Sequence, residues 1–165
     1  MIKGYKAFNK DCTNRYGKVF VEGQTYHTEG ELRFGNYGNG YHFCERLEDT
    51  LRYFPAMEEE IKIAEVTSLE DFIQANDETY GYYDMYAART LRIDKFLTRE
   101  EIITMYLDMN VEYQVKRFVA SFKLTPEETE LFKLKYADNY RIMQTIAYYQ
   151  EDNKDVYDKP KVKRR

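Results

Sequence analysis

Glycine is absent from the second half of this chain. All eight glycines of the 165 residues lie at or before Gly81. Glycine gives the backbone the freedom that tight turns need, and it lowers stability inside a helix. The distribution therefore predicts a turn-rich first part of short strands and a helical second part. A chain of this length is typical of one domain, or of one domain with a helical extension.

In the first part, apolar and polar residues alternate over short runs, which favours β-strands. The predicted strands are 2–8, 18–22, 25–27, 41–44, 61–66 and 90–96. The leucines and phenylalanine of 45–54 recur at helical spacing, so a helix is expected there that ends before Pro55. A short helix is also expected over 68–74, where Ser68 and Asp71 resemble a capping box.

The second part carries two helix-start signals. Thr98 and Glu101 form one capping box, and Thr125, Pro126 and Glu128 form another. The first helical stretch is expected to break near Asn110, and the helix that begins after Thr125 is expected to end near Gln150. The resulting fold class is α+β. Residues 1–97 form a small antiparallel or mixed sheet with packed helices, 98–151 a helical extension packed on it, and 152–165 a charged, disordered tail.

Composition excludes several classes of protein. No apolar run approaches the roughly 18–20 residues that a membrane helix needs, and the opening residues lack the apolar core of a secretory signal. A cytoplasmic location is therefore expected. Cys12 and Cys44 are then expected to be reduced, apolar packing residues rather than a disulfide. His27 and His42 have no metal-ligand spacing, so no metal and no resident cofactor are expected.

The formal charge of −4 conceals an uneven distribution. Residues 45–84 hold twelve acidic side chains against Arg46, Arg52 and Lys62, whereas 159–165 are strongly basic. An acidic body repels phosphates and attracts basic partners, which argues against direct nucleic-acid binding. The basic tail is typical of a solubilising terminus, with phosphate contact or targeting as the alternative.

The acidic stretch is also rich in tyrosine, a residue that suits recognition surfaces because its large ring ends in a hydrogen-bonding group. Carboxylates can take the place of phosphates toward arginine. A partner-binding surface is therefore predicted, against the alternative of an ordinary solvated face over a ring-filled core. Its residues are Glu58, Glu59, Glu60, Asp77, Glu78, Tyr80, Tyr82, Tyr83, Asp84 and Tyr86.

Several short motifs occur in a fixed order over about residues 3–105. The residues that carry them are Tyr5, Lys6, Phe8, Asn9, Asp11, Thr13, Arg15, Gly23, Tyr26, Gly40, His42, Phe43, Cys44, Ala64, Glu65, Val66, Ile93, Leu97 and Thr98. This pattern resembles an uncharacterised small domain of bacteriophage and prophage proteins. The resemblance implies a mobile-element origin and no known activity, and it implies that the expected cytoplasmic location is in a host bacterial cell. Phage accessory proteins of this size often block a host machine, so we expect non-covalent binding to a host protein with a basic groove. A counter-defence inhibitor of the anti-CRISPR kind is one example, and a structural virion component is a further alternative.

A competing hypothesis comes from the segment 38–43, which precedes a helix and Tyr53. In outline it is similar to the glycine-rich strand and following helix of ADP-ribosyltransferase folds, which hold NAD in an open cleft. This similarity would make Tyr41 or Tyr53 the ring that holds NAD and Glu65 the catalytic carboxylate, with His42 nearby. The early strand offers Tyr5 and Lys6 where those enzymes have His or Arg, and their closing strand is missing. The alternative is a purely structural role for this loop, strand and helix, with Phe43 in the core and His42 a half-buried hydrogen-bonding residue.

Two other segments favour structural roles. The polar run 9–15 is typical of a loop organised by Asn and Asp side chains, because a calcium loop needs more carboxylates and a defined glycine. The helix expected over 125–150 lacks the turn glycine and basic recognition helix of a DNA-reading motif. It is interpreted as a packing helix, which leaves a homodimer through the C-terminal helices open.

Overall fold

The computed structural model describes residues 1–35, 37–75 and 85–151. The chain divides into two compact units. One contains Met1–Phe54 and Glu60–Leu97, and the other contains Pro55–Glu59 and the chain from Thr98 onward. The sequence had placed Pro55–Glu59 with the strands. The two units are described separately below.

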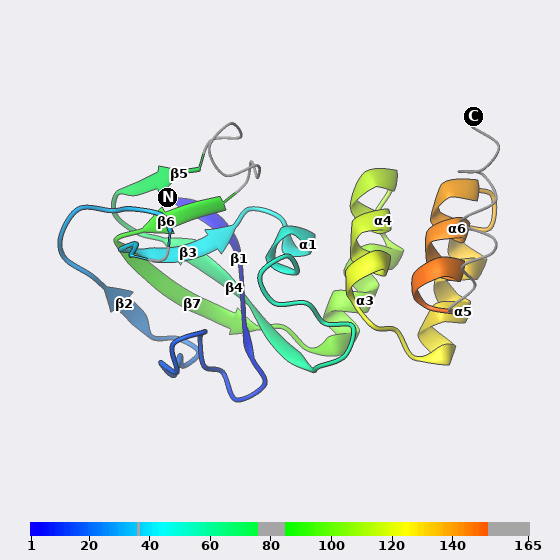
Figure 1. The fold of residues 1–165 in the computed structure, drawn as a ribbon, viewed down its shortest axis with the longest axis horizontal. Helices are drawn as coiled ribbons and strands as arrows, with labels where there is room; N and C mark the ends of the chain where they lie inside the picture. Colours follow the sequence, from blue (N-terminus) through cyan, green and yellow to red (C-terminus); the bar gives the residue numbers. More distant parts are fainter. Residues whose placement is uncertain (36, 76–84, 152–165) are drawn as a thin grey trace. The chain divides into compact units, whose positions relative to one another are not determined.

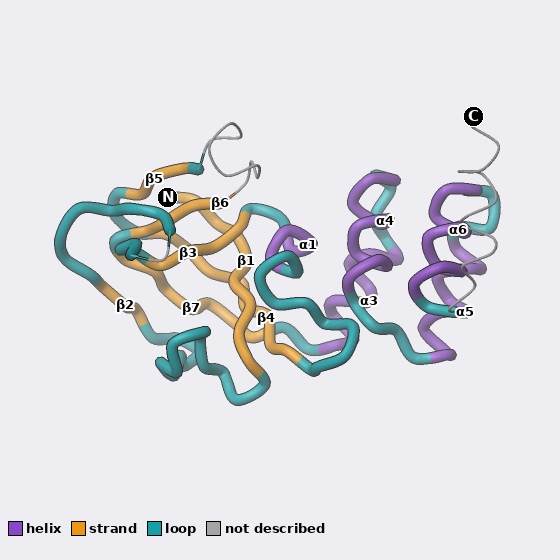
Figure 2. Tube along the Cα trace, viewed as in Figure 1, coloured by secondary structure: helices purple, strands orange, loops and turns teal. Residues whose placement is uncertain are grey.

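The first unit is built on one antiparallel sheet with the strand order β2-β7-β4-β1-β3-β6-β5 (Figures 1 and 2). Its strands are β1 (Ile2–Asn9), β2 (Thr25–His27), β3 (Tyr41–Cys44), β4 (Ile61–Ser68), β5 (Phe72–Gln74), β6 (Met85–Ala88) and β7 (Thr90–Phe96). β1 lies at the centre and pairs with β4 along its whole length, from Ile2 opposite Ser68 to Asn9 opposite Ile61. The predicted α+β fold class is confirmed.

Aromatic side chains fill one face of this sheet. Phe8 and Phe20 are fully buried with ring centroids 5.0 Å apart, and Phe43 stacks on Tyr86 at 5.2 Å. Val66 and Ile93 face each other across β4 and β7 in the same cluster. The predicted burial of Phe43 is confirmed. Burial of these rings supplies most of the driving force for folding of this unit.

Three sequence-based predictions about this unit are wrong. Residues 18–22 form no strand, because Val19 finds only an isolated bridge to Thr13 while Phe20 anchors the segment in the core. Residues 68–74 end in strand β5 rather than in a helix, because Phe72 pairs with β6 and packs against Tyr86. The helix expected over 45–54 is only the short α1 (Leu47–Thr50) followed by turns.

The second unit contains α3 (Arg99–Leu107), α4 (Glu112–Ser121), α5 (Pro126–Lys135) and α6 (Tyr140–Tyr149). Both predicted capping boxes are present, and the predicted break near Asn110 separates α3 from α4. The single helix expected over 125–150 is instead two helices, because the Asn139 side chain accepts from the Ile142 amide and starts α6.

The core of the helical unit is a stack of rings. Tyr106 and Phe118 are fully buried with centroids 3.9 Å apart, and Phe132 lies 6.0 Å from Phe118. The Tyr136 hydroxyl donates to the backbone carbonyls of Tyr106 and Met109, which fixes the end of α3. None of the helices in the described ranges has the length and apolar character needed to cross a membrane.

Candidate ligand-binding cleft

A cleft opens where the central strand β1 separates from its neighbour β3. Tyr5 opposite Cys44 is the one register pair between them, whereas β3 pairs with β6 over its four residues. An uninterrupted ladder would continue with Lys6 opposite Phe43 and Ala7 opposite His42. The two strands instead diverge after Tyr5, so the sheet has a gap beside its central strand.

Gly4 lies at the end of the gap where β1 and β3 are in close contact. A Cβ atom at position 4 would lie only 2.3 Å from the Cys44 carbonyl oxygen and 2.8 Å from a ring carbon of Phe43. Only glycine permits so close an approach of the two strands. At the open end, the Lys6 amine donates to the His42 carbonyl oxygen at 2.5 Å. The His42 carbonyl, which has no backbone partner on β1, thus receives its hydrogen bond from the lysine side chain.

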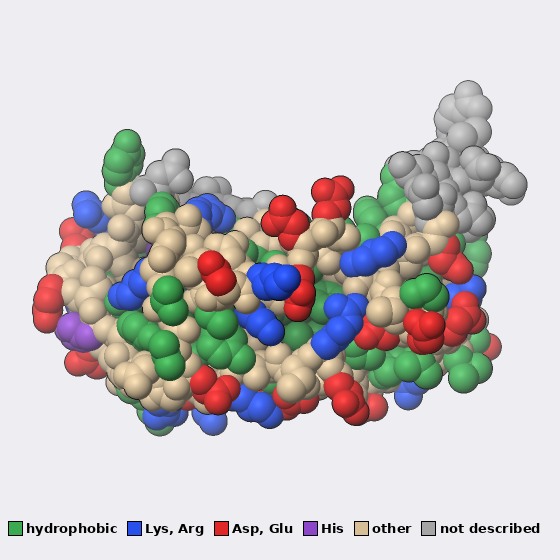
Figure 3. Space-filling view, turned by 90° about the horizontal axis from the view of Figure 1, so that it is seen from below, with side chains coloured by type: hydrophobic (Ala, Val, Ile, Leu, Met, Phe, Trp, Pro, Cys, Tyr) green, Lys and Arg blue, Asp and Glu red, His purple; other side chains and the backbone are tan. Residues whose placement is uncertain are grey.

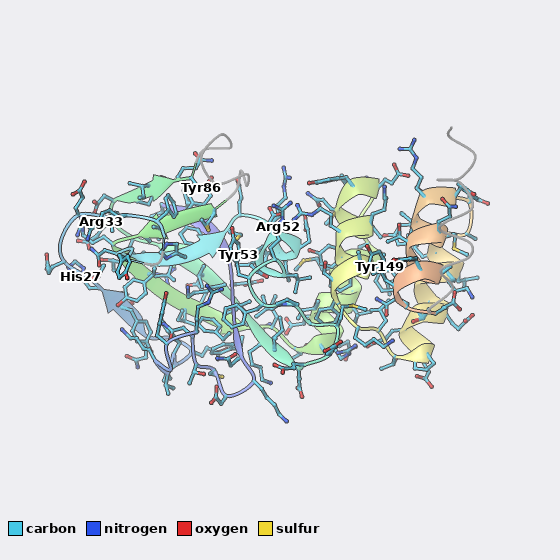
Figure 4. The ribbon with its side chains drawn as sticks, viewed as in Figure 1. His27, Arg33, Arg52, Tyr53, Tyr86 and Tyr149 are labelled. Carbon is cyan, nitrogen blue, oxygen red and sulfur yellow. The ribbon has the colours of Figure 1, made fainter. Side chains whose placement is uncertain are left out.

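The cleft is half open to solvent and has a volume of about 560 Å³, a size typical of small-molecule sites. Four tyrosines are among the residues that line it: Tyr5 on β1, Tyr16, Tyr41 on β3 and Tyr53. Figure 4 shows Tyr53 in the turn after α1. Lys6, Asn14, Arg15 and Asn39 add polar groups, and none of the described residues that line it is acidic. The lining therefore combines flat rings, amides and positive charge.

The charged groups of the cleft act on one another. Burial, followed by the charge of Arg15, lowers the pKa of the Lys6 amine to about 8 from its usual 10.5, and Cys44 acts in the opposite direction. Burial, followed by the charge of Lys6, lowers the pKa of His42 to about 4. Burial, then Glu65 and Glu48, raises the pKa of Tyr5. At neutral pH the cleft thus presents positive lysine and arginine beside an uncharged histidine.

Tyr41 is held in place by a cation. The Lys18 amine donates to the Tyr41 hydroxyl at 3.1 Å and lies 5.1 Å from the centroids of both Tyr41 and Tyr26 and 5.6 Å from that of Phe20. Cation–π attraction of this kind favours a fixed ring orientation. The Tyr41 ring is therefore preorganised at the cleft.

Two loops bring the polar groups to the cleft. In the polar run 9–15, the predicted organisation by Asn and Asp side chains is confirmed, since Asn9 donates to the Asn14 carbonyl and Asp11 accepts from the Thr13 amide. In the loop between β2 and β3, the Asn39 amide donates to the carbonyls of Glu29 and Glu31.

Arg89 ties that second loop to the sheet. Its Nε donates to Asp71 at 2.7 Å, and its Nη1 donates to the carbonyls of Thr28 and Gly30 at 3.2 and 2.8 Å. The bidentate pair with Asp71 lowers the pKa of that carboxyl. The loop that carries Asn39 and Gly40 is thus fixed at its start by one guanidinium group.

The NAD hypothesis named four residues, of which the cleft contains Tyr41, His42 and Tyr53. His42 is half-buried, as expected, and its lowered pKa keeps it neutral. Glu65 is not part of the lining. It lies on β4 opposite Tyr5, close enough to act on the Tyr5 pKa. Lys6, Arg15 and Asn39 were not selected as site residues from the sequence. Lys6 and Arg15 did belong to the recognised motifs, but their proximity depends on the gap in the sheet.

The predicted partner surface is described only in part. Glu58, Glu59 and Glu60 are exposed, whereas Asp77, Glu78, Tyr80, Tyr82, Tyr83 and Asp84 lie outside the described residues. Tyr86 is 5% exposed and stacks on Phe43, so its assignment to an exposed surface is wrong. On the face drawn in Figure 3, acidic and basic side chains are interspersed.

Cys44 is buried and Cys12 is half-buried, and neither forms a disulfide. Within the described ranges, no group of three His, Cys, Asp or Glu side chains is arranged to hold a metal ion.

Residues 2–105 match the family described as Domain of unknown function (DUF7666), and the chain belongs to this family. No curated protein and no solved structure matches the chain. The family match covers the strand-containing unit, and with it every residue of the cleft, and extends into α3.

Proposed function

We propose that the cleft between β1 and β3 binds a nucleotide, with a dinucleotide of the NAD class as the first candidate. One observation carries this proposal: Lys6, Arg15 and four tyrosines share a cleft whose described lining contains no carboxylate. Phosphates need positive charge and hydrogen-bond donors, and a purine or nicotinamide ring needs a flat aromatic partner. The lining offers both within a volume that suits such a ligand.

The proposal assigns different parts of the ligand to different residues. Lys6 and Arg15 attract the phosphates, and Asn14 and Asn39 contribute amide groups at the same lining. Tyr41, held by Lys18, offers a preorganised ring face. His42 stays neutral and contributes no charge of its own at pH 7.

The proposed activity is binding rather than ADP-ribosyl transfer. Transfer would need a carboxylate beside the reacting ribose, and Glu65, the residue named for this role, does not line the cleft. Incubation with labelled NAD and host lysate separates the two. Labelled protein that disappears in Glu65→Gln would overturn the binding-only proposal.

Isothermal titration calorimetry with NAD, AMP and the uncharged nicotinamide riboside analogue benzamide riboside tests the proposal. NAD and AMP should bind and the phosphate-free compound should bind at least tenfold more weakly. Loss of one charge-assisted contact, worth about 1.5–3 kcal/mol, should weaken NAD binding by roughly 10–100-fold in Lys6→Met or Arg15→Gln. Lys3→Met is the matched control, because Lys3 is an exposed residue on the same strand. Equal NAD affinity in the Lys3 and Lys6 variants would refute the assignment.

The phage origin and the binding of a host protein stay predictions. The binding of a basic partner is supported by the exposure of Glu58, Glu59 and Glu60, the last of which lies 3.9 Å from the Lys10 amine. Pull-down from a bacterial host followed by charge reversal at these three positions tests that hypothesis. Retained binding after the reversal would exclude these residues from the interface, and a virion protein inventory tests the structural alternative.

A further inference from the structure

Lys6 occupies an unusual place for a lysine. Its side chain is half-buried inside the gap between two strands of a sheet, and its amine rests against the His42 carbonyl and 5.8 Å from the centroid of the Phe8 ring. Arg15 lies near it and no acidic side chain lines the cleft among the described residues. A surface lysine is normally surrounded by water, whereas Lys6 lines a half-open cleft large enough for a small molecule.

We propose that the Lys6 amine is a covalent attachment site, which forms an imine with the carbonyl group of a small anionic aldehyde or ketone bound in the cleft. The inference deepens the proposed function, since it uses the same anion-binding cleft, but it does not require the ligand to be a nucleotide. Arg15 supplies the positive charge that holds the anionic group of such a ligand while Lys6 reacts.

The chemistry requires no redox partner. The lone pair of the neutral amine attacks the carbonyl carbon, and a proton moves from nitrogen to the oxygen to give a carbinolamine. Loss of that oxygen as water, together with the second amine proton, leaves the C=N bond. One amine and one carbonyl compound thus give one imine and one water molecule.

The surroundings of Lys6 favour the neutral amine that this reaction needs. Burial and Arg15 lower its pKa to about 8, whereas Cys44 acts the other way and His42 is itself uncharged. At pH 7.4 roughly a fifth of such an amine is neutral, compared with about a thousandth for a lysine at its usual value. The remaining protonated fraction keeps Lys6 able to attract an anion. The lower basicity also makes the neutral amine a weaker nucleophile, so the expected net advantage is on the order of tenfold.

The probe is pyridoxal 5′-phosphate, an anionic aldehyde, added to the full chain and followed by borohydride reduction and peptide mass spectrometry. Lys6 should be labelled roughly tenfold or more faster than the exposed Lys3 of the same strand. Lys6→Arg should abolish that label and Lys3→Arg should leave it. Arg15→Gln should slow labelling by pyridoxal 5′-phosphate but not by pyridoxal, which lacks the phosphate.

Peptide mapping of the unaltered chain keeps the test independent of how well a variant folds. Labelling spread over exposed lysines, with Lys6 no faster than Lys3, would overturn the inference. NAD added before the probe distinguishes the two proposals. If NAD protects Lys6, both are supported, whereas fast labelling of Lys6 that NAD leaves unchanged supports the covalent site and counts against the nucleotide.

Discussion

Titration of the two histidines by NMR measures the electrostatic environment of the cleft directly. His42 lies in the cleft lining, where burial and then the charges of Lys6 and Arg15 lower its pKa to about 4. His27 lies on β2, where a hydrogen bond to Glu29 raises its pKa. The chain has only these two histidines, so each signal can be assigned by a single substitution. The two should titrate on opposite sides of 6.5.

The shift at His42 also has a consequence for stability. Its folded pKa lies below the unfolded value of 6.5, so the folded protein binds fewer protons than the unfolded chain between these two values. The stability contributed by a neutral His42 is therefore complete above pH 6.5 and is lost as pH falls toward 4. The difference between the folded and unfolded pKa values corresponds to a loss of roughly 2–3 kcal/mol in the free energy of unfolding at the low end of this pH range. Urea unfolding of the unaltered chain and of His42→Gln, at pH 7 and pH 4.5, measures it as the difference between the two proteins.

Lys6→Met tests the cause of the shift. Removal of one of the two neighbouring charges should raise the His42 pKa, but not to 6.5, because burial is the larger cause and remains. Lys3→Met, at an exposed position of the same strand, should leave it unchanged. A His42 signal that titrates near 6.5 in the folded chain would refute the assignment of a positive, water-poor cleft. A His42 pKa that is unchanged in Lys6→Met would refute it as well.

Three further predictions concern the framework around the cleft. Gly4→Ala should lower the free energy of unfolding by about 2–4 kcal/mol in urea titrations, because the new methyl group would lie 2.3 Å from the Cys44 carbonyl oxygen. An unchanged unfolding midpoint would contradict the close contact between the strands. Thr125→Ala should cost about 1 kcal/mol by the same assay through loss of the α5 cap, whereas Thr125→Ser should cost much less. Arg89→Gln should speed hydrogen exchange in the loop that begins at Thr28 without a comparable effect on β1 and β4, and uniform acceleration throughout the sheet would contradict a local role.

Helix starts were predictable from the sequence because their physics is local. Thr98 and Thr125 need only a glutamate three residues later, and both form the expected reciprocal hydrogen bonds. The division between α5 and α6 was missed although the same kind of signal was present. Asn139 is a good N-cap residue, but the apolar spacing continues through it and suggested one long helix.

Strands that depend on distant partners were harder to predict. β6 (Met85–Ala88) is buried at all four positions, so it lacks the alternation that marks a half-buried strand. The segment before β5 carries a helix-cap pattern, yet Phe72–Gln74 pairs with β6 and becomes a strand. The local preference for a helix is overridden here, because the sheet supplies backbone partners for this segment and Phe72 packs against the Tyr86 ring.

The cleft itself follows from an interaction that no local pattern encodes. The sequence predicted a strand at 2–8 and another at 41–44, and both are present. It did not show that their backbones would pair only at Tyr5 and Cys44. Gly4 explains the contact and Lys6 explains how the strand edge is satisfied, but each role appears only once the two strands are neighbours. Tyr41 and Tyr53 were selected as a site because their spacing matched a known pattern, whereas Arg15 required the fold.

The overall charge of the chain and the charge of the cleft have different consequences for a long polyanion and for a small anion. The formal charge is −4, which disfavours a long polyanion whose phosphates would extend over the whole surface. A small anion interacts with the nearest groups, because charges beyond about 8–10 Å are screened at physiological salt. Lys6 and Arg15 are the positively charged residues of the cleft lining, and the burial of Lys6 strengthens its attraction to an anion. Mononucleotides and dinucleotides should therefore bind better than oligonucleotides of the same base composition. Binding that instead rises with each added nucleotide would place the phosphate contacts outside the cleft.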